Sequence, residues 1–208
     1  LNNYAEELIA EKDSKPAFKG YKGFPAALCV SLNQEIVHGV PSDRKLEEGD
    51  VLSLDLGLVY NGFFSDMAVT LAIGGVSSES RRLIRITKKS LKRAIARMKP
   101  GKHLGDVSHA VQNYIEDQGF YVIRQLCGHG IGKKLHEDPD ILNVGQRHKG
   151  PELKKGMVFA IEPMAAMGTT GIKISKNGFA FETADGGLSA HFEHTIAITE
   201  KGPWVLTE

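Results

Sequence analysis

The stretch Val51–Ile73 consists of two apolar runs that flank the pair Asn61-Gly62. Asn-Gly accepts the positive φ angles of a type I′ turn and is the strongest short-range signal for a β-hairpin. With these two residues as the loop, Gly57 lies opposite Asp66. Asp55 points to the same face as Gly57, because side chains alternate with period two along a strand. The pattern therefore predicts a hairpin that carries Asp55 and Asp66 as diagonal cross-strand neighbours.

These two aspartates have two interpretations. The hairpin contains no Lys or Arg, and a buried carboxylate needs a partner. Diagonal neighbours lie roughly 7 to 8 Å apart at the backbone, and both could then reach a pair of metal ions about 3.5 to 4 Å apart. The alternative is an edge hairpin with two solvated aspartates. The hairpin alone leaves both interpretations open.

The rest of the chain alternates between helical and strand patterns. Apolar periodicity predicts helices over 1–11, 77–98 and 104–118. Short apolar runs predict strands over 26–32, 35–40, 120–126, 157–162, 172–174, 179–183 and 191–199. This order predicts an α+β fold of two similar halves packed through their sheets. No linker divides the halves, so we expect one domain over residues 1–208.

Composition limits the classes of function. A chain of 208 residues that is 41% hydrophobic can bury a full core. Its net charge of +1 provides no global field that favours DNA or a membrane. The basic run Arg81–Lys99 is one face of a predicted helix, which indicates a solvated surface; docking to an acidic partner such as ribosomal RNA is the alternative.

Cellular location follows from cysteine usage and hydropathy. Cys29 and Cys127 are the only cysteines, which favours a reducing, cytoplasmic setting. No apolar run approaches the length of a membrane span, and no signal peptide is visible. The chain begins at Leu1 rather than Met, so a leader could have preceded it.

Five side chains are candidate metal ligands: Asp55, Asp66, His129, Glu162 and Glu193. Each has a simpler reading, namely a solvated hairpin for the aspartates, a flexible glycine loop for His129, a strand-end charge for Glu162 and an exposed strand position for Glu193. However, the glycines around His129 permit a close backbone approach that an ordinary surface loop does not require.

Taken together, four carboxylates in apolar strands would repel one another if they converged without cations. Two divalent cations would neutralise them and make a bridging hydroxide electrostatically acceptable. Oxygen ligands with one imidazole suit Mn²⁺, Fe²⁺, Co²⁺ or Zn²⁺.

Several ordered motifs resemble those of the type I methionine aminopeptidases. They are Asp55 with Asp66 eleven positions later, CGHGIGKKLHEDP at 127–139, Ile161-Glu162-Pro163-Met164 and Phe192-Glu193-His194-Thr195. The resemblance runs almost from end to end. The interval between Glu162 and Glu193 leaves no room for the inserted subdomain of the type II enzymes. Glu193-His194-Thr195 also favours this family over prolidase and aminopeptidase P.

The resemblance implies a pita-bread fold, with two pseudo-symmetric halves around a dinuclear metal centre. It implies that Asp55 chelates one metal, that His129 and Glu162 chelate the other, and that Asp66 and Glu193 bridge both. Glu162 would also shuttle the proton. The implied reaction is removal of the initiator methionine from nascent polypeptides by attack of a metal-bridging hydroxide.

The resemblance also implies roles around the substrate. His38 would lie near the scissile nitrogen, and His136 would bond the substrate carbonyl and steady the oxyanion. The methionine pocket would be lined by Tyr21, Phe24, Cys29 and Phe179, whose apolar, polarizable walls suit a thioether. Without the resemblance, His38 and His136 would be interpreted as turn and loop histidines. Tyr21 and Phe24 would be loop anchors, and Phe179 would be an ordinary core residue.

Some positions depart from the family pattern or extend it. Relatives commonly carry Tyr where Phe24 stands and Trp where Phe179 stands, so the shape of the pocket is expected to differ. Asn33 and Ser189 match positions that hold a structural monovalent cation. The family's first helix has no counterpart before Leu1, so we expect an incomplete cover over one sheet.

Two other functions compete with this expectation. One is a prolidase-like X-Pro dipeptidase, and the other is a metal-free pita-bread protein that serves only as a binding module. The partners expected for the aminopeptidase are peptides with an N-terminal methionine and the ribosome, with no DNA or membrane partner and a monomeric state.

Overall fold

The computed structural model describes all 208 residues and contains three α-helices, a short 3-10 helix and fifteen strands. The helices are α1 (Asn2–Glu11), α2 (Ser78–Ile95) and α3 (Leu104–Asp117), and the 3-10 helix is η1 (Tyr21–Gly23). The strands are β1 (Lys15–Pro16), β2 (Leu28–Leu32), β3 (Glu35–Val37), β4 (Val51–Tyr60), β5 (Phe63–Ala72), β6 (Tyr121–Val122), β7 (Cys127–Gly130), β8 (Glu137–Leu142), β9 (Val158–Ile161), β10 (Met164–Ala166), β11 (Ile172–Ile174), β12 (Phe181–Thr183), β13 (Ser189–His191), β14 (His194–Thr199) and β15 (Gly202–Val205).

The hairpin predicted from Asn61-Gly62 is present as β4 and β5. Asn61 and Gly62 have φ angles of 50° and 77°, and Gly57 pairs with Asp66, as the sequence predicts. Strand β4 is not at an edge, because β2 and β1 pair with its other side. Asp55 and Asp66 are only 8% and 5% exposed. The interpretation as a solvated edge hairpin is therefore wrong.

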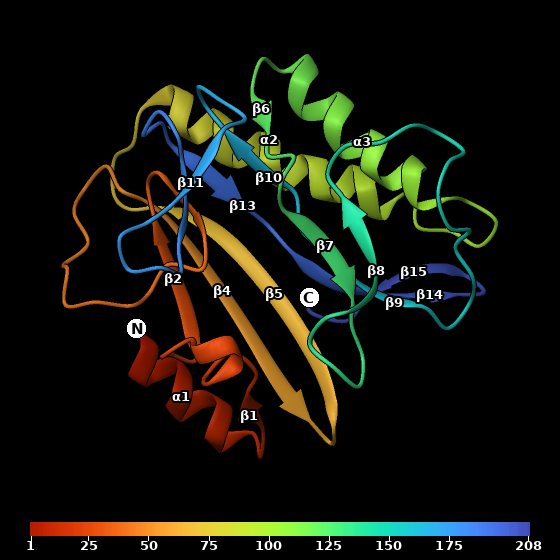
Figure 1. Cartoon of the computed structure of the whole chain (residues 1–208), viewed down its shortest axis with the longest axis horizontal. Coiled ribbons are helices and arrows are strands. Elements are labelled where there is room, and N and C mark those ends of the chain that lie inside the picture. The colour runs from red at the N-terminus through yellow and green to blue at the C-terminus, as the bar shows by residue number, and fades with distance from the viewer.

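Two large sheets form the centre of the molecule (Figure 1). One holds β1, β2, β4 and β5, and the other has the order β15-β14-β9-β7-β8. They meet where Glu193 N donates to Ala68 O at 2.9 Å, just before β14 begins. Two three-stranded sheets, β13-β10-β6 and β11-β12-β3, complete the structure.

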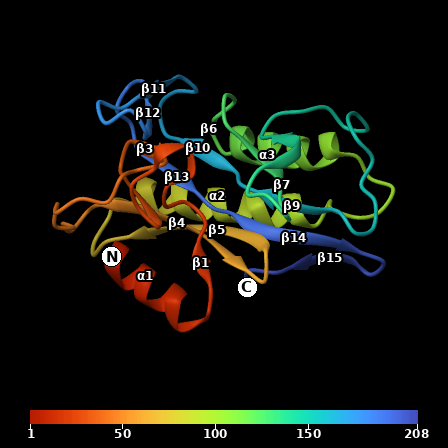
Figure 2. The same cartoon turned by 60° about the horizontal axis from the view of Figure 1, so that its bottom comes forward.

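Helices cover both faces of this arrangement (Figure 2). The apolar faces of α2 and α3 are buried in the largest hydrophobic core, where Leu83 and Val107 are fully enclosed with Ile196 of β14. Ser77 caps α2 by accepting a hydrogen bond from Ser80 N at 3.0 Å, which satisfies one of the free N–H groups at the helix start. On the opposite face, Ala5 of α1 packs in a smaller core with β2 and β4.

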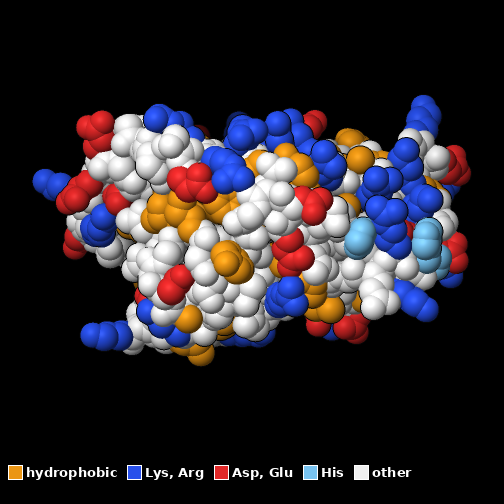
Figure 3. Space-filling view, turned by 90° about the horizontal axis from the view of Figure 1, so that it is seen from above, with side chains coloured by type: hydrophobic (Ala, Val, Ile, Leu, Met, Phe, Trp, Pro, Cys, Tyr) orange, Lys and Arg blue, Asp and Glu red, His pale blue; other side chains and the backbone are white.

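Most of the basic run lies on the exposed face of α2, and Arg97 and Lys99 follow the end of the helix. Lys and Arg side chains are prominent on the face that carries α2 and α3 (Figure 3). Arg82 lies over the ring of Phe120 and Arg93 over that of Tyr114, at 4.7 and 4.2 Å from the centroids. None of the three α-helices is long and apolar enough to cross a membrane.

The predicted helices are correct to within a few residues, but one long predicted strand is interrupted. The strand predicted over 157–162 ends at Ile161, and β10 continues in another sheet after Glu162-Pro163. The strand predicted over 191–199 begins earlier, as β13, and is broken at Phe192-Glu193. Strand β9 pairs with β14 and β10 pairs with β13, so the two segments pass from one sheet to the other side by side.

Other differences concern short elements. The strand predicted over 120–126 is reduced to β6, and β1, β8, β10 and β15 were not predicted. Residues 127–130, predicted as loop, form strand β7. The intrinsic strand propensity of Gly-His-Gly is low, but β7 is held on both sides by pairing with β8 and β9.

Candidate metal centre

The five candidate ligands line one cavity of about 410 Å³ between the two large sheets. Asp55 and Asp66 come from β4 and β5, and His129 comes from β7. Glu162 and Glu193 occupy the two points at which the chain changes sheet. A regular strand would direct successive side chains to opposite faces, whereas each break lets one carboxylate turn into the space between the sheets.

The donor atoms of these residues are close together. One donor atom each from Asp66, His129 and Glu193 lies within 4.8 Å of the others. His129 Nε2 is 3.8 Å from Glu162 Oε1. Asp55 Oδ1 and Glu193 Oε1 are buried and have no hydrogen-bond partner. Because buried polar atoms are nearly always partnered, this set fits a cation-binding site.

The electrostatics of the cavity support the same assignment. Lys22 is the only Lys or Arg that lines it. Burial raises the pKa of Asp66 to about 7. Burial, together with repulsion from neighbouring carboxylates, raises the pKa of Glu162 and Glu193 well above the usual value. In the metal-free protein the carboxylates therefore resist sharing this space as anions, and cations would relieve the repulsion.

His129 is oriented by its own strand. Its Nδ1 is 2.9 Å from the carbonyl oxygen of Gly130, which can only accept, so Nδ1 carries the hydrogen. The lone pair is then on Nε2, the nitrogen that faces Glu162. Burial also lowers the pKa of His129, which favours the neutral ring that a metal ligand needs.

The glycines next to His129 are required by packing. A Cβ atom at Gly128 would lie 2.3 Å from Ala160 O, and one at Gly130 would lie 2.4 Å from Asp138 O. His129 itself is only 5% exposed. The interpretation of this segment as a flexible surface loop is therefore wrong.

His38 and His136 line the same cavity, and both are exposed. His136 Nδ1 is 2.9 Å from Tyr21 Oη, and the two rings are stacked. Partial desolvation and the neighbouring His129 lower the pKa of His136 to about 4, so its ring is neutral at pH 7. His38 has a φ of 59°, a conformation that non-glycine residues adopt mostly where the surroundings impose it.

The apolar part of the cavity contains the aromatic residues predicted from the sequence. Phe24 meets Phe179 edge to face, with ring centroids 5.6 Å apart. Cys29 is buried beside them, and burial followed by the charge of Asp55 raises its thiol pKa well above the usual value. Tyr21 is more open to solvent.

The sequence analysis did not identify several residues of the site. Phe18, Val37, Leu135 and Phe181 also line the cavity. The sequence feature that could have identified them is their position, since each is within three residues of a predicted site residue. His191 was also missed: it is 1% exposed and lies 3.5 Å from Glu162 Oε2. Its signal was its position two residues before Glu193.

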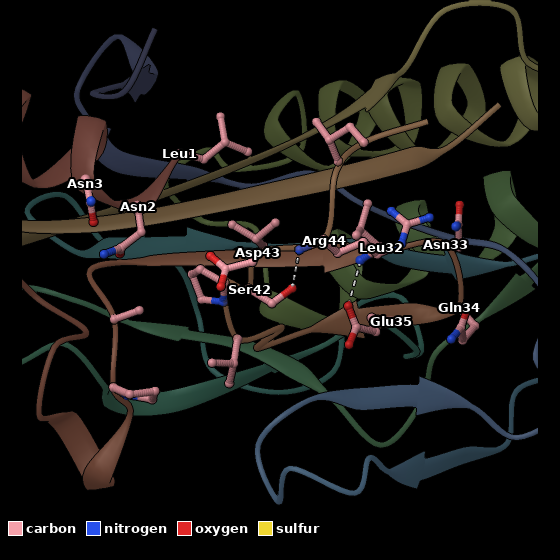
Figure 4. Close-up of a pocket in the computed structure, with 16 residues that line it drawn as sticks. Leu1, Asn2, Asn3, Leu32, Asn33, Gln34, Glu35, Ser42, Asp43 and Arg44 are labelled. Carbon is pink, nitrogen blue, oxygen red and sulfur yellow. Dashed lines mark hydrogen bonds between the residues drawn. The ribbon is translucent and has the colours of Figure 1, made fainter. Parts of the chain in front are cut away.

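A larger recess of about 930 Å³ shares no lining residue with this cavity (Figure 4). Its polar groups are largely paired with one another or with the backbone: Leu32 N donates to Glu35 Oε2 at 2.8 Å, and Arg44 is paired with Asp50. Asn33, at its edge, accepts hydrogen bonds at its carbonyl from Ser189 N and Oγ at 2.9 and 3.1 Å. The two residues named for a monovalent cation are thus neighbours.

This cavity, with its carboxylates and imidazole between two sheets, belongs to a class of metal-dependent peptidase. The chain is a member of metallopeptidase family M24, whose family model matches residues 2–200. The α+β architecture is accordingly the pita-bread fold, as predicted.

Within this family, the chain is similar to methionine aminopeptidases. That of Clostridium acetobutylicum is 46% identical over 208 residues, which are 100% of this chain and 83% of the relative. Methionine aminopeptidase 1 of Bacillus subtilis is 45% identical over 207 residues, covering 100% and 84% of the two chains.

Solved structures agree with this grouping. The methionine aminopeptidase of Thermotoga maritima superposes with a TM-score of 0.98 at 46% identity, covering 100% of this chain and 84% of that one. The prolidase of Pyrococcus furiosus superposes with a TM-score of 0.70 at 28% identity, covering 87% and 48%. Most of this chain thus shares its fold with about half of the prolidase chain, at a lower level of similarity.

Proposed function

We propose that this protein is a methionine aminopeptidase that removes the initiator methionine from new polypeptides in the cytoplasm. The observation that carries the proposal is the convergence of four carboxylates and one imidazole beside an apolar, aromatic pocket in a single cavity. Relatives that match the whole of this chain carry the name methionine aminopeptidase. We take residues 1–208 as one catalytic domain.

In this proposal Asp55, His129 and Glu162 would each hold one of two divalent cations, and Asp66 and Glu193 would contribute to both. When bound, two divalent cations of the Mn²⁺, Fe²⁺, Co²⁺ or Zn²⁺ type supply the positive charge that lowers the pKa of water and polarises the substrate carbonyl. The unpartnered atoms Asp55 Oδ1 and Glu193 Oε1 support this ligand set. A structural monovalent cation beside Asn33 and Ser189 is a further part of the proposal.

The other polar residues act on the peptide. Glu162 is the proposed proton-shuttling group, which would take a proton from the attacking water and release it to the departing amide nitrogen. His136 accepts from the Tyr21 hydroxyl at Nδ1 in the tautomer that leaves Nε2–H free to donate to the substrate carbonyl. His38, which also lines the cavity, would lie near the scissile nitrogen.

The specificity for methionine is assigned to Tyr21, Phe24, Cys29 and Phe179. A thioether gains favourable contacts with aromatic edges, and the crossed rings of Phe24 and Phe179 offer such edges. We expect the enzyme to act as a monomer on peptides with an N-terminal methionine, and on chains emerging from the ribosome.

Two rival functions are less well supported. A prolidase-like dipeptidase shares the fold, but the similarity to prolidase is lower and covers less of both chains than the similarity to methionine aminopeptidase. A metal-free binding module does not need five converging ligands, and burying four carboxylates together without cations is unfavourable.

The test is peptide hydrolysis by chelator-stripped protein to which Mn²⁺, Fe²⁺, Co²⁺ or Zn²⁺ is returned one at a time. We expect release of methionine from Met-Ala-Ser and no cleavage of X-Pro dipeptides. Asp66→Asn should abolish turnover and most metal uptake, whereas Asp117→Asn on the surface of α3 should change neither. Near-parental turnover by Asp66→Asn would refute the ligand assignment, and hydrolysis of X-Pro dipeptides alone would favour the prolidase-like function.

A further inference from the structure

His191 is a buried imidazole with no assigned role. It ends β13, directly opposite Met164 in β10, and its side chain is 1% exposed. Neither ring nitrogen has a hydrogen-bond partner. Burying an unpaired polar group is costly, so a ring enclosed in this way calls for an explanation.

The carboxylates that face this ring are the two that emerge where the chain changes sheet. His191 Nε2 is 3.5 Å from Glu162 Oε2 and 3.8 Å from Glu193 Oε2. The other oxygen of Glu162, Oε1, faces His129 Nε2 at 3.8 Å. His129 lines the cavity and His191 does not. Glu162 is therefore held between two imidazoles, one on the cavity side and one behind it.

The chemistry of the contact fixes the role of Nε2. Ionised carboxylate oxygens are acceptors only, so an imidazole nitrogen that faces two of them is favourable when it carries a hydrogen. A carboxylate that binds a metal through one oxygen is commonly steadied through the other by such an outer donor.

The backbone of His191 is held in place independently of its ring. The hydroxyl of Thr70 donates to His191 O and accepts from His191 N at 2.6 and 2.8 Å. These bonds hold the backbone on both sides of the residue and do not involve the ring. A substitution of the side chain therefore leaves the anchoring of β13 intact.

We propose that His191 is a positioning residue that donates an Nε2–H hydrogen bond to the outer oxygens of Glu162 and Glu193 and so fixes both carboxylates for metal binding. This rests on the proposed function, in which Glu162 and Glu193 are ligands. His191 touches neither the cavity nor the substrate, so its effect reaches the reaction only through these two side chains.

Two amide variants separate the two ring nitrogens. The amide nitrogen of Gln reaches the place of Nε2, whereas that of Asn reaches only the place of Nδ1. Both are polar and uncharged, so the cost of burying them is similar. His191→Gln should therefore retain the function that His191→Asn loses, and His191→Leu should behave as Asn does.

The experiment is a calorimetric titration of the chelator-stripped full chain with Mn²⁺. Thermal unfolding of each metal-free variant checks that it folds. Loss of an outer-shell donor weakens metal binding by about 10- to 100-fold. We expect that loss in His191→Asn and His191→Leu, a fall in kcat with KM little changed, and near-parental Mn²⁺ affinity in His191→Gln. Equal affinities for the Asn and Gln variants, or parental affinity in the Leu variant, would overturn the proposal.

Asp66→Asn in the same titration separates the two levels of inference. If Asp66→Asn loses Mn²⁺ binding and His191→Asn does not, the proposed role of His191 is wrong and the ligand set stands. If Asp66→Asn also binds Mn²⁺ normally, the ligand set is wrong. Should the Asn and Leu variants not fold, a crystal structure of the parent with Mn²⁺ decides. His191 Nε2 within hydrogen-bond distance of Glu162 Oε2 supports the proposal, and Nε2 bound to the metal itself overturns it.

Discussion

The hydroxyl of Thr195 bonds both backbone polar groups of Asp66. It accepts from Asp66 N at 2.8 Å and donates to Asp66 O at 2.8 Å. Both residues are buried, and they lie in β5 and β14, in different sheets. Thr195 follows Glu193 by two positions, so this contact fixes two proposed bridging carboxylates relative to each other.

Replacing this hydroxyl should loosen the centre. Thr195→Val has nearly the same volume but leaves a buried N–H and a buried C=O unpaired, which we expect to cost about 2 to 4 kcal/mol. Urea unfolding of the metal-free protein measures the free energy, and Mn²⁺ titration measures the effect on the site. Thr195→Ser keeps the hydroxyl and should lose less than half as much stability. Equal stability of the Val and parent proteins would show that water replaces the hydroxyl.

The hairpin could be predicted in detail because its determinants are local. Asn61-Gly62 sets the turn, and the apolar runs on either side set the register that pairs Gly57 with Asp66. The helices were predicted for the same reason, since periodicity and caps such as Ser77 act over a few residues. Burial of Asp55, by contrast, depends on β2 and β1, which the hairpin sequence does not contain.

The break at Phe192-Glu193 could not be predicted from local patterns, whereas Pro163 marks the end of the strand that precedes Glu162. The run 191–199 looks like one continuous strand, and only its pairing with β9 and β10 decides where the chain passes from one sheet to the next. The five site residues were selected from ordered motifs shared with a family, whereas their individual patterns left simpler interpretations open. The residues without a motif, such as His191 and Phe18, were missed.

A methyl group at position 57 should disturb the pocket wall. A Cβ atom there would lie 2.5 Å from Phe18 Cε1 and 3.1 Å from Ala17 Cβ. Phe18 lines the cavity, so we expect Gly57→Ala to lower stability by about 1 to 3 kcal/mol and to raise KM for Met-Ala-Ser. The double variant Gly57→Ala/Phe18→Leu should recover part of the stability because the smaller side chain makes room. No recovery would indicate that the clash is relieved through Ala17 instead.

The contact between Tyr21 and His136 can be tested by removing one oxygen. Tyr21→Phe keeps the stacked ring but loses the hydrogen bond to Nδ1. A hydrogen bond at an exposed position is worth about 1 kcal/mol, so we expect kcat/KM to fall roughly five-fold. His136→Ala should lose about 100-fold or more, since it also removes the donor to the substrate carbonyl. If both variants lose the same amount, the tyrosine hydroxyl has a role of its own in the reaction.

Asp50 should make stability depend on pH in the acid range. Its carboxylate receives two bonds from Arg44, at 2.8 and 2.9 Å, together with bonds from Asn33 Nδ2 and Glu47 N. The bonds from Arg44, followed by that from the backbone of Glu47, hold the pKa of Asp50 well below its usual range. The folded protein thus binds a proton at this site less readily than the unfolded chain does.

The stabilisation by Asp50 is therefore complete above the unfolded pKa of about 4 and is lost as the pH falls below it. We expect Asp50→Asn to reduce the free energy of unfolding by about 1 to 2 kcal/mol at pH 7, and by clearly less at pH 3. Urea unfolding of both proteins at the two pH values measures the difference. Arg44→Gln should show the same convergence, because it removes the partner that lowers the pKa. A difference between parent and Asp50→Asn that grows on acidification would contradict the assignment, since it would require a carboxyl whose pKa is raised by folding.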